Sequence, residues 1–410
     1  MDGRRIYQPW TIGNVWKFHR EIDGLNWQFG GEKMHYNFLH RTEFHPHAVV
    51  YRAGAITPLP EAPHQDLARF PVRSRLGELP LEDYIRRAPV NGIIVVQHGR
   101  ILYESYPRMR PFDKHLLMSV TKVFVSTLVA ILTSRGLVDP YLPLPHILFP
   151  LTGSGWHSVT VQDALDMASG IDAPEVEQGF TDPNHPYYQY EASLGWLPAT
   201  PQTLDSTYAY VASLRAKDPP GQQYEYTSVN TFLLSWLAEH VTGLPLSELL
   251  TQEIWSKTGP EADGLLAVSK TGAPAAHGGL CAALRDVARF GLLFTPSSRA
   301  LFPVPVIPAG HLDKIQSGGR REIFDRGPSG PKIVEKLHGE HPRHNVDQWD
   351  YILEDGDFFK GGYGGQGLYI SPAHDLVIAY FGTPFDERME THELEWITRQ
   401  IVNSGLLERG

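Results

Sequence analysis

One long helix is predicted by the stretch LLMSVTKVFVSTLVAILTSR, which covers residues 116–135. Its apolar side chains point to every side of the predicted helix rather than forming one stripe, which is typical of a helix buried inside a domain. Gly136 follows directly and suits the end of the helix, because glycine accepts the left-handed backbone of a C-terminal cap. The stretch therefore predicts a central helix around which the rest of the chain packs.

A serine and a lysine lie three residues apart at the start of this helix, at Ser119 and Lys122. Residues i and i+3 share one face of a helix, so the two side chains can meet. A serine hydroxyl is a weak nucleophile until a base takes its proton, and a desolvated lysine loses its own proton more easily. The pair is a candidate nucleophile and base. The structural alternative is a serine that caps the helix and a lysine on the surface.

The same spacing occurs again at Ser329 and Lys332. Gly330 and Pro331 stand between these two residues, and we expect them to disfavour the helical turn that would bring both side chains onto one face. We therefore assign the nucleophile to Ser119 and not to Ser329.

Strands are predicted near both ends of the chain. A β-branched run at 93–96 and an alternating segment at 101–104 predict a hairpin before the central helix. A second hairpin is predicted from segments 368–370 and 376–381, which are separated by the turn at 371–375. Helical segments lie between the two hairpins, so we expect one sheet that is assembled from distant parts of the chain.

The predicted fold is α/β (α+β), with an antiparallel sheet flanked by helices and a mostly helical subdomain over the catalytic groove. Residues 1–85 are expected to form an N-terminal arm packed on the core. Residues 86–139 and 275–410 are expected to form the α/β domain, and residues 140–274 the helical subdomain. A long loop bordering the site is expected over 296–350, with a surface insertion as the alternative.

Composition and charge limit the classes of partner. The 410 residues are 42% hydrophobic and 20% charged, which excludes a disordered chain. The net charge is −10 and the basic residues are scattered, so no nucleic-acid-binding surface is expected. The N-terminal residues form no apolar run of signal-peptide length, and no stretch reaches the roughly 18 apolar residues of a membrane span. We expect a soluble, cytoplasmic protein with a small-molecule substrate and no membrane partner; a homodimer is left open.

The single cysteine, Cys281, excludes an intramolecular disulfide and a multi-cysteine metal site. It is expected in the core, on a helix over 278–294. The 19 histidines include His40, His45 and His47, but no carboxylate or cysteine frame surrounds these three and no His-Glu-x-x-His motif occurs. We expect chemistry that needs no metal and no cofactor.

A tyrosine motif lies downstream of the serine, at Tyr226-Thr227-Ser228, where a polar turn opens an apolar helix. Together with Ser119 and Lys122, it resembles the first two motifs of the penicillin-recognising serine hydrolases. These include class C β-lactamases, family VIII carboxylesterases and 6-aminohexanoate-dimer (nylon-oligomer) hydrolases. The similarity covers roughly residues 85–400, and the segments that carry it are 96–104, 164–170 and 278–286.

The third motif of this family is a Lys-Thr-Gly-like triplet on a strand beside the site. Literal copies begin at Lys257 and Lys270, but neither enters a predicted strand, so we take neither. The better candidate begins at Lys360 and enters the predicted strand at 368–370, with Gly361 in place of the threonine. This departure resembles the nylon-oligomer hydrolase and carboxylesterase branches more than the true β-lactamases.

The resemblance implies that the glycine-rich segment contacts the substrate through Lys360, Gly362 and Gly364, since glycine allows a close approach of the backbone. It also implies an oxyanion hole made by the N–H groups of Ser119 and Tyr363. The structural alternative is a glycine-rich hairpin turn.

Other substrate-binding residues are inferred from their position. Ser228 and Asn230 are expected to orient Lys122 or the substrate. His277 precedes the Gly-Gly step that should border the pocket, and a structural role fits it equally well. Aromatic residues lie where the family contacts its substrate, with ordinary loop packing as the alternative; they are Tyr187, Tyr188, Tyr190 and Trp196.

The expected function is hydrolysis of a small ester or amide through an acyl-enzyme on Ser119. Lys122 and Tyr226 together take the serine proton, and Tyr226 then protonates the leaving group. Either residue can activate the water that releases the acyl group. The alternatives are an acyltransferase of the same fold and a catalytically silent, penicillin-binding-like protein.

Overall fold

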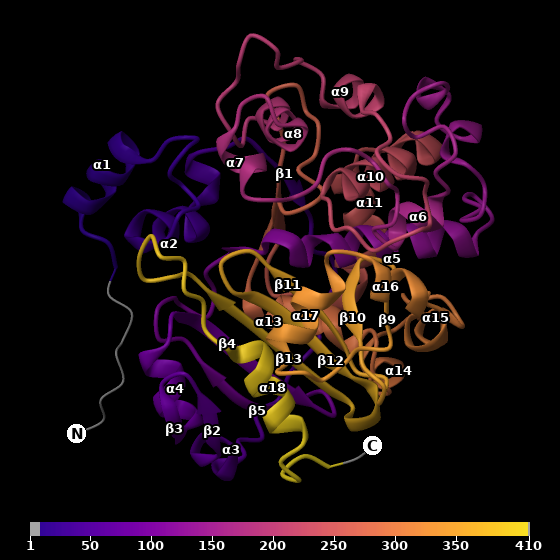
Figure 1. The fold of residues 1–410 in the computed structure, drawn as a ribbon. Coiled ribbons are helices and arrows are strands. Elements are labelled where there is room, and N and C mark those ends of the chain that lie inside the picture. Colours follow the sequence, from indigo (N-terminus) through magenta and orange to yellow (C-terminus); the bar gives the residue numbers. More distant parts are fainter. Residues whose placement is uncertain (1–8, 409–410) are drawn as a thin grey trace.

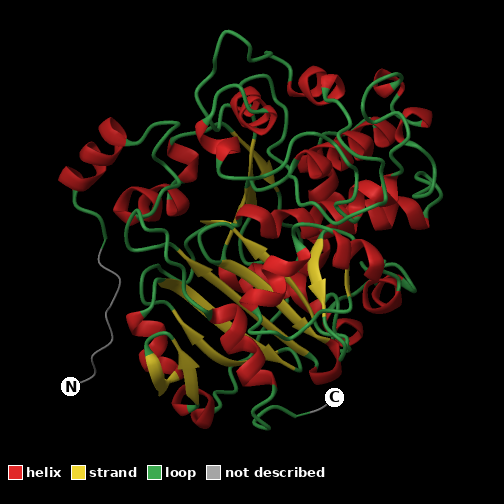
Figure 2. Cartoon of the chain, viewed as in Figure 1, coloured by secondary structure: helices red, strands yellow, loops and turns green. Residues whose placement is uncertain are grey.

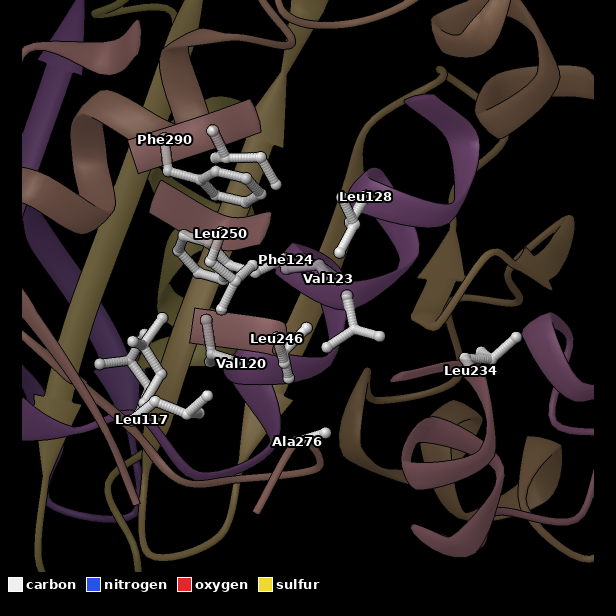
Figure 3. Close-up of a cluster of buried hydrophobic side chains, with 14 of the residues drawn as sticks. Leu117, Val120, Val123, Phe124, Leu128, Leu234, Leu246, Leu250, Ala276 and Phe290 are labelled. Atoms are coloured by element: carbon white, nitrogen blue, oxygen red, sulfur yellow. The ribbon is translucent and has the colours of Figure 1, made fainter. Parts of the chain in front are cut away.

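A buried helix, α5 (Thr121–Ser134), lies at the centre of the computed structural model, which describes residues 9–408. A short 3-10 turn, η2 (Met118–Val120), leads into it, and Gly136 follows it with a φ of 73°. Figure 3 shows apolar side chains of α5 among those of α11 (Leu246–Leu250) and α13 (Leu284–Leu292). The central helix predicted from the sequence is confirmed.

The main sheet has seven antiparallel strands in the order β5-β4-β13-β12-β11-β10-β9 (Figure 1). The first two, β4 (Val90–Gln97) and β5 (Arg100–Ser105), form the predicted N-terminal hairpin. β4 pairs directly with the C-terminal strand β13, with Val95 opposite Ile378, so one sheet is assembled from both ends of the chain. The C-terminal strands are β9 (His344–Val346), β10 (Trp349–Ile352), β11 (Phe358–Gly362), β12 (Gln366–Ser371) and β13 (Leu376–Gly382).

Helices cover both faces of this sheet (Figure 2). Ile94 and Val96 of β4 pack on one face, in the core that contains α5 and α13. Their neighbours Ile93 and Val95 pack on the other face, in the core that contains α4 (Leu81–Arg87) and α18 (Leu394–Val402). A strand that is buried on both sides is apolar at successive positions, which explains the unbroken run of the sequence. No helix in the described range is both long and apolar enough to cross a membrane.

A helical layer lies above one edge of the sheet, with α5 between the two (Figure 1). It begins with α6 at Val161, where Thr160 makes a reciprocal capping box with Asp163. The helices of this layer are α6 (Val161–Leu165), α7 (Gln178–Thr181), α8 (Pro186–Leu194), α9 (Thr207–Ser213), α10 (Val229–Thr242), α11 and α12 (Ser256–Thr258).

The N-terminal arm has more regular structure than its sequence indicated. Its strand β1 (His47–Val50) pairs with β7 (Gly264–Ala267) in a small four-stranded sheet that also contains β6 (His115–Leu116) and β8 (Leu280–Ala282). Residues 1–8 lie outside the described part. The other elements of the arm are α1 (Ile12–Glu21), α2 (Gly31–Leu39), α3 (Gln65–Arg69), β2 (Pro71–Ser74) and β3 (Gly77–Pro80).

Two expectations for the C-terminal half are wrong. The helix expected over 278–294 begins only at Leu284, because Cys281 lies in β8 and pairs with Leu265 of β7. A strand of three residues is too short to show a period of its own. The region 296–350 is not one long loop, because it contains four short helices, α14 (Ser298–Leu301), α15 (His311–Ser317), α16 (Arg321–Arg326) and α17 (Gly330–Lys336).

The central helix generates a stability prediction. Phe124 of α5 stacks on Phe290 of α13, with ring centroids 3.8 Å apart. Phe124→Ala should lower the free energy of unfolding by about 3–5 kcal/mol, because it leaves a cavity between the two helices. Urea unfolding measures this loss. Phe149→Ala is the matched control, since 78% of Phe149 is exposed. Equal losses in the two variants would contradict a core centred on α5.

Candidate active site

Ser119 and Lys122 meet at the start of the central helix. Ser119 lies in η2, and the Nζ of Lys122, in the first turn of α5, is 3.0 Å from its Oγ. Met118, just before the serine, has a φ of 47°. A left-handed backbone at a residue with a side chain is strained, and such strain is often found at functional sites. The local chain therefore presents the serine hydroxyl directly to the lysine.

Lys122 is fully buried and has two further partners. Its Nζ donates to the Oγ of Ser228 over 2.9 Å and to the carbonyl oxygen of His277 over 2.8 Å. Ser228 in turn donates to Glu175 over 2.6 Å. Burial lowers the pKa of Lys122 to about 7, against the opposing effect of the Glu175 carboxylate, and Lys360 lowers it further. The lysine can thus lose its proton near neutral pH.

The hydrogen bonds around Lys122 suit the neutral amine. A neutral lysine has two N–H donors and one lone pair. The Oγ of Ser228 and the carbonyl of His277 accept the two donors, since the proton of Ser228 already points to Glu175. The lone pair is then left for the hydroxyl of Ser119. In this arrangement the amine can act as a general base toward the serine.

Tyr226 lies beside both Ser119 and Lys122, and the Nζ of Lys122 is 5.1 Å from the centroid of its ring. Its hydroxyl accepts a hydrogen bond from Lys360 over 3.1 Å, and Ser119 is a second hydrogen-bond partner. Lys360 lies on β11, is fully buried and forms an ion pair with Asp350 of β10. Burial, together with the charges of Asp350 and Glu175, holds the pKa of Tyr226 well above its usual value. The tyrosine therefore carries its proton at neutral pH.

The glycine-rich segment begins in β11, beside the nucleophile. A side chain at Gly362 would bring a Cβ to within 2.7 Å of the carbonyl oxygen of Leu117, so only glycine fits this close approach. Gly362, Tyr363 and Gly364 all line the same cavity as Ser119. The other two Lys-Thr-Gly copies lie at the end of α12 and in the turn after β7, away from this cavity.

A cavity of about 490 Å³ opens over the nucleophile. Ser119, Glu175 and Tyr226 line it on the side of the helical layer, and β11 lines it on the side of the sheet. The segment before α17 and the helix itself form another wall, so part of the 296–350 region does border the site. The volume is suited to a small organic substrate.

The predicted aromatic residues lie behind the site rather than in the described wall of the cavity. All four are at least 97% buried, and none of them lines the cavity within residues 9–408. Tyr187 hydrogen bonds with Ser228, and the hydroxyl of Tyr190 lies 2.9 Å from Nδ1 of His277. Contact of Tyr187, Tyr188, Tyr190 and Trp196 with a substrate stays a prediction.

The backbone carbonyl of His277 is one of the hydrogen-bond acceptors of Lys122. Its Nε2 lies 3.1 Å from a carboxylate oxygen of the buried Glu191, and its ring packs against Trp196 with centroids 4.9 Å apart. The N-terminal arm reaches this point as well, since Trp27 donates to the carbonyl of Trp196 and the guanidinium of Arg41 lies 3.9 Å over the Trp27 ring. The arm therefore packs against the residues that support the lysine.

Sequence reasoning missed three carboxylates of the site, Glu175, Glu191 and Asp350. Each of them meets its partner only in the folded chain, and no motif spacing in the sequence identifies it. The only sequence feature that could have indicated one of them is the acidic side chain of Asp350 inside an apolar segment. Asn230 is buried, and its side-chain amide is 3.5 Å from the sulfur of Met167. No group of three or more His, Cys, Asp or Glu side chains within residues 9–408 is placed to hold a metal ion.

The prediction that Gly330 and Pro331 prevent a helix after Ser329 is wrong. The helix α17 begins directly after Ser329, with Pro331 in its first turn. Proline is tolerated there because the first N–H groups of a helix have no partner within the helix. Ser329 instead accepts the backbone N–H of Tyr226 over 3.0 Å, while Lys332 is exposed. Ser329 thus contacts the backbone of Tyr226, and the second pair forms no buried dyad.

The comparisons with known proteins agree with this geometry. The beta-lactamase family model matches residues 84–399, and the chain belongs to this family of serine hydrolases. The 6-aminohexanoate-dimer hydrolase of Paenarthrobacter ureafaciens is 29% identical over 347 residues, which is 83% of this chain and 83% of that protein.

Solved structures share the fold. A Bacillus anthracis protein with a provisional 6-aminohexanoate-dimer hydrolase assignment has a TM-score of 0.80 at 22% identity, covering 94% of this chain and 97% of its own. EstCE1, a hydrolase with promiscuous acyltransferase activity, has a TM-score of 0.57 at 14% identity, covering 75% and 92%. The β-lactamase and penicillin-binding-protein-like fold that the sequence predicted is confirmed.

The pKa of Lys122 generates a prediction for the pH dependence. The base form is the active one, so the rate of Ser119 acylation should be low below the lysine pKa, rise through about pH 7 and level off above it. Stopped-flow hydrolysis of an activated ester across this range measures the profile, with the Ser119→Ala protein as the background. A rate that is constant across neutral pH would contradict Lys122 as the base.

Proposed function

We propose that the chain is a serine hydrolase that cleaves a small ester or amide through an acyl-enzyme on Ser119, as a carboxylesterase or a nylon-oligomer-like amidase. The observation that carries the proposal is the 3.0 Å contact between Ser119 and a fully buried Lys122 whose other hydrogen bonds are already satisfied. The relationship to 6-aminohexanoate-dimer hydrolase supports the amide branch.

Acylation begins when neutral Lys122 takes the proton of Ser119. The serine oxygen then attacks the substrate carbonyl, and the bond to the leaving group breaks after a tetrahedral intermediate. The N–H groups of Ser119 and Tyr363 stabilise its oxyanion, a contribution whose removal typically costs about 10²–10³ in turnover. Protonated Tyr226 donates to the leaving oxygen or nitrogen. The Lys122 ammonium, whose Nζ lies 5.1 Å from the centroid of the tyrosine ring, then returns the proton it took from Ser119 to the tyrosine oxygen.

Deacylation uses the same groups in reverse order. A water molecule replaces the leaving group beside Tyr226, and Lys122, again neutral, draws a proton from it through the tyrosine hydroxyl. The ion pair of Lys360 and Asp350 holds the tyrosine hydroxyl in place during both steps. We also propose a cytoplasmic location, which the single buried cysteine favours.

Two other functions remain as outcomes of the tests. An acyltransferase would pass the acyl group to an alcohol or amine instead of water, and EstCE1 is a hydrolase with such promiscuous acyltransferase activity. A penicillin-binding-like protein would become acylated without release, or would only bind its ligand.

Labelling with a fluorophosphonate tests the nucleophile. The folded protein should form one adduct on Ser119, because the hydroxyl is activated by Lys122 and lines an open cavity. Intact-mass and peptide mass spectrometry locate the adduct. Ser329→Ala is the matched control and should still be labelled, whereas Ser119→Ala should not. An unlabelled folded protein would exclude the enzyme function.

Substitution of the proton-transfer groups tests the mechanism. Lys122→Ala and Tyr226→Phe should each lower kcat/KM for p-nitrophenyl esters by about 10²- to 10⁴-fold, the usual contribution of a positioned acid or base. Tyr226→Phe should lose more on an amide, such as 6-aminohexanoate dimer, than on a p-nitrophenyl ester, because a p-nitrophenolate leaves without a proton. Unchanged turnover in a folded Lys122→Ala protein would remove the lysine from the mechanism.

A substrate panel separates the remaining possibilities. Short p-nitrophenyl esters, 6-aminohexanoate dimer and nitrocefin should be compared at equal enzyme concentration, with and without an added alcohol. Ester or dimer hydrolysis without nitrocefin turnover is the expected outcome, since Gly361 replaces the threonine of the third β-lactamase motif. Product shifted from acid to ester by the alcohol would assign the acyltransferase.

A further inference from the structure

The position of Tyr226 shows where the leaving group lies. Any group that this tyrosine protonates must start within hydrogen-bonding distance of its hydroxyl. The cavity continues past Tyr226 along α17, whose preceding residue Ser329 accepts the tyrosine N–H over 3.0 Å. The part of the cavity beside α17 is therefore on the leaving-group side of Ser119. This assignment rests on the proposed function.

Two lysines of α17 face this part of the cavity. Lys332 and Lys336 both line it, and both are exposed. They are four residues apart, so they lie about 6 Å from each other along the helix axis, one turn above the other. Like charges at this spacing repel each other by a few tenths of a kcal/mol. Within residues 9–408 neither lysine has an ion pair or a side-chain hydrogen bond.

Three of the four carboxylates that line the same cavity are already engaged, and the fourth is Glu395. Asp350 is paired with Lys360, Glu225 with Lys217 over 2.8 Å, and Glu175 accepts the hydroxyl of Ser228. The unpaired charge of the wall is therefore positive. An anionic group would find two free ammonium donors there, whereas a cationic group would find no free carboxylate among these three.

Two further polar side chains, Tyr380 and Glu395, belong to the wall of this cavity. The Tyr380 ring covers Gly367 of β12, its side chain is 99% buried, and its hydroxyl has no hydrogen-bond partner among the described residues. Glu395 of α18 lines the same cavity, and burial raises its pKa to about 7, although the charge of Lys336 lowers it. A carboxyl group that keeps its proton can donate to an acceptor.

We propose that Lys332 and Lys336 select substrates whose leaving group carries an anionic group, a carboxylate being the simplest case. The free ammonium groups bind this anion beyond Tyr226. The leaving group of an ω-amino acid amide, or of an acylated hydroxy acid, has this form. The lysines contact the substrate away from the reacting atoms, so they determine specificity rather than the chemistry.

Two esters with the same acyl group test the proposal. The ratio of kcat/KM for 4-acetoxybenzoate to that for its neutral methyl ester is measured in the parent protein and in Lys332→Met/Lys336→Met. The ratio should fall about tenfold in the double variant, as expected for the loss of two charge-assisted contacts at a partly exposed site. Added salt should lower the parent ratio as well, because it screens these charges.

Lys270→Met is the matched control, because Lys270 is exposed and does not line the cavity. It should leave the ratio unchanged. If both esters are hydrolysed and the double variant keeps the parent ratio, the anion specificity is wrong while the hydrolase function stands. An equal fall of the ratio in the Lys270 variant would reduce the effect to net charge and would overturn the proposal too.

A binding measurement covers the case in which neither ester is hydrolysed, which would count against the proposed function. Calorimetry with the Ser119→Ala protein compares 4-acetoxybenzoate with the same methyl ester. Tighter binding of 4-acetoxybenzoate than of its methyl ester supports the anion site by itself, provided that the difference is lost in the Ser119→Ala/Lys332→Met/Lys336→Met protein. Equal or absent binding of the two ligands overturns it.

Discussion

The burial of Lys122 is the constraint on which the rest of the site depends. An ammonium group without solvent is expensive, and the protein meets this cost by allowing the lysine to be neutral near pH 7 rather than by pairing it directly with a carboxylate. Glu175 contacts Lys122 only indirectly, because Ser228 lies between the two and hydrogen bonds with both. A direct ion pair would have kept the proton on the lysine and left Ser119 without a base. Lys360, which is buried to the same extent, differs in having a direct partner, because burial lowers its pKa while the paired Asp350 carboxylate opposes this shift beside Tyr226.

These two lysines are held by two different layers of the fold. The helical layer holds the neutral amine, through Ser228 at the start of α10 and the carbonyl of His277. The sheet holds Lys360, the lysine that is paired with a carboxylate, through β10 and β11. The cavity lies where the layers meet, so their relative position sets how far Ser119 and Lys122 lie from β11. The aromatic contacts of Trp27 with Trp196, and of Trp196 with His277, extend this support into the N-terminal arm.

The sequence was informative where a short spacing or a local period determines the structure. The three-residue interval between Ser119 and Lys122, the tyrosine motif and the two hairpins were all predictable for this reason. The predicted strand after Lys360 distinguished the candidate third motif from the literal Lys-Thr-Gly copies. The carboxylates Glu175, Glu191 and Asp350 were not predictable, because tertiary contacts alone give them their partners. The strand around Cys281 was too short to interrupt a helical pattern. The start of α17 was misjudged because proline was treated as if it stood inside a helix.

The pairing of β4 with β13 also determines when the site can exist. Val95 finds Ile378 only after nearly the whole chain has been synthesised, and β11, which carries Lys360, joins the same sheet through β12. Contacts between such distant segments form slowly, since much chain entropy is lost before they form. During synthesis Ser119 and Lys122 leave the ribosome long before the strand that completes their cavity. In the growing chain Ser119 and Lys122 therefore lack the cavity wall that β11 forms, and this wall is added only when the C-terminal strands close the sheet.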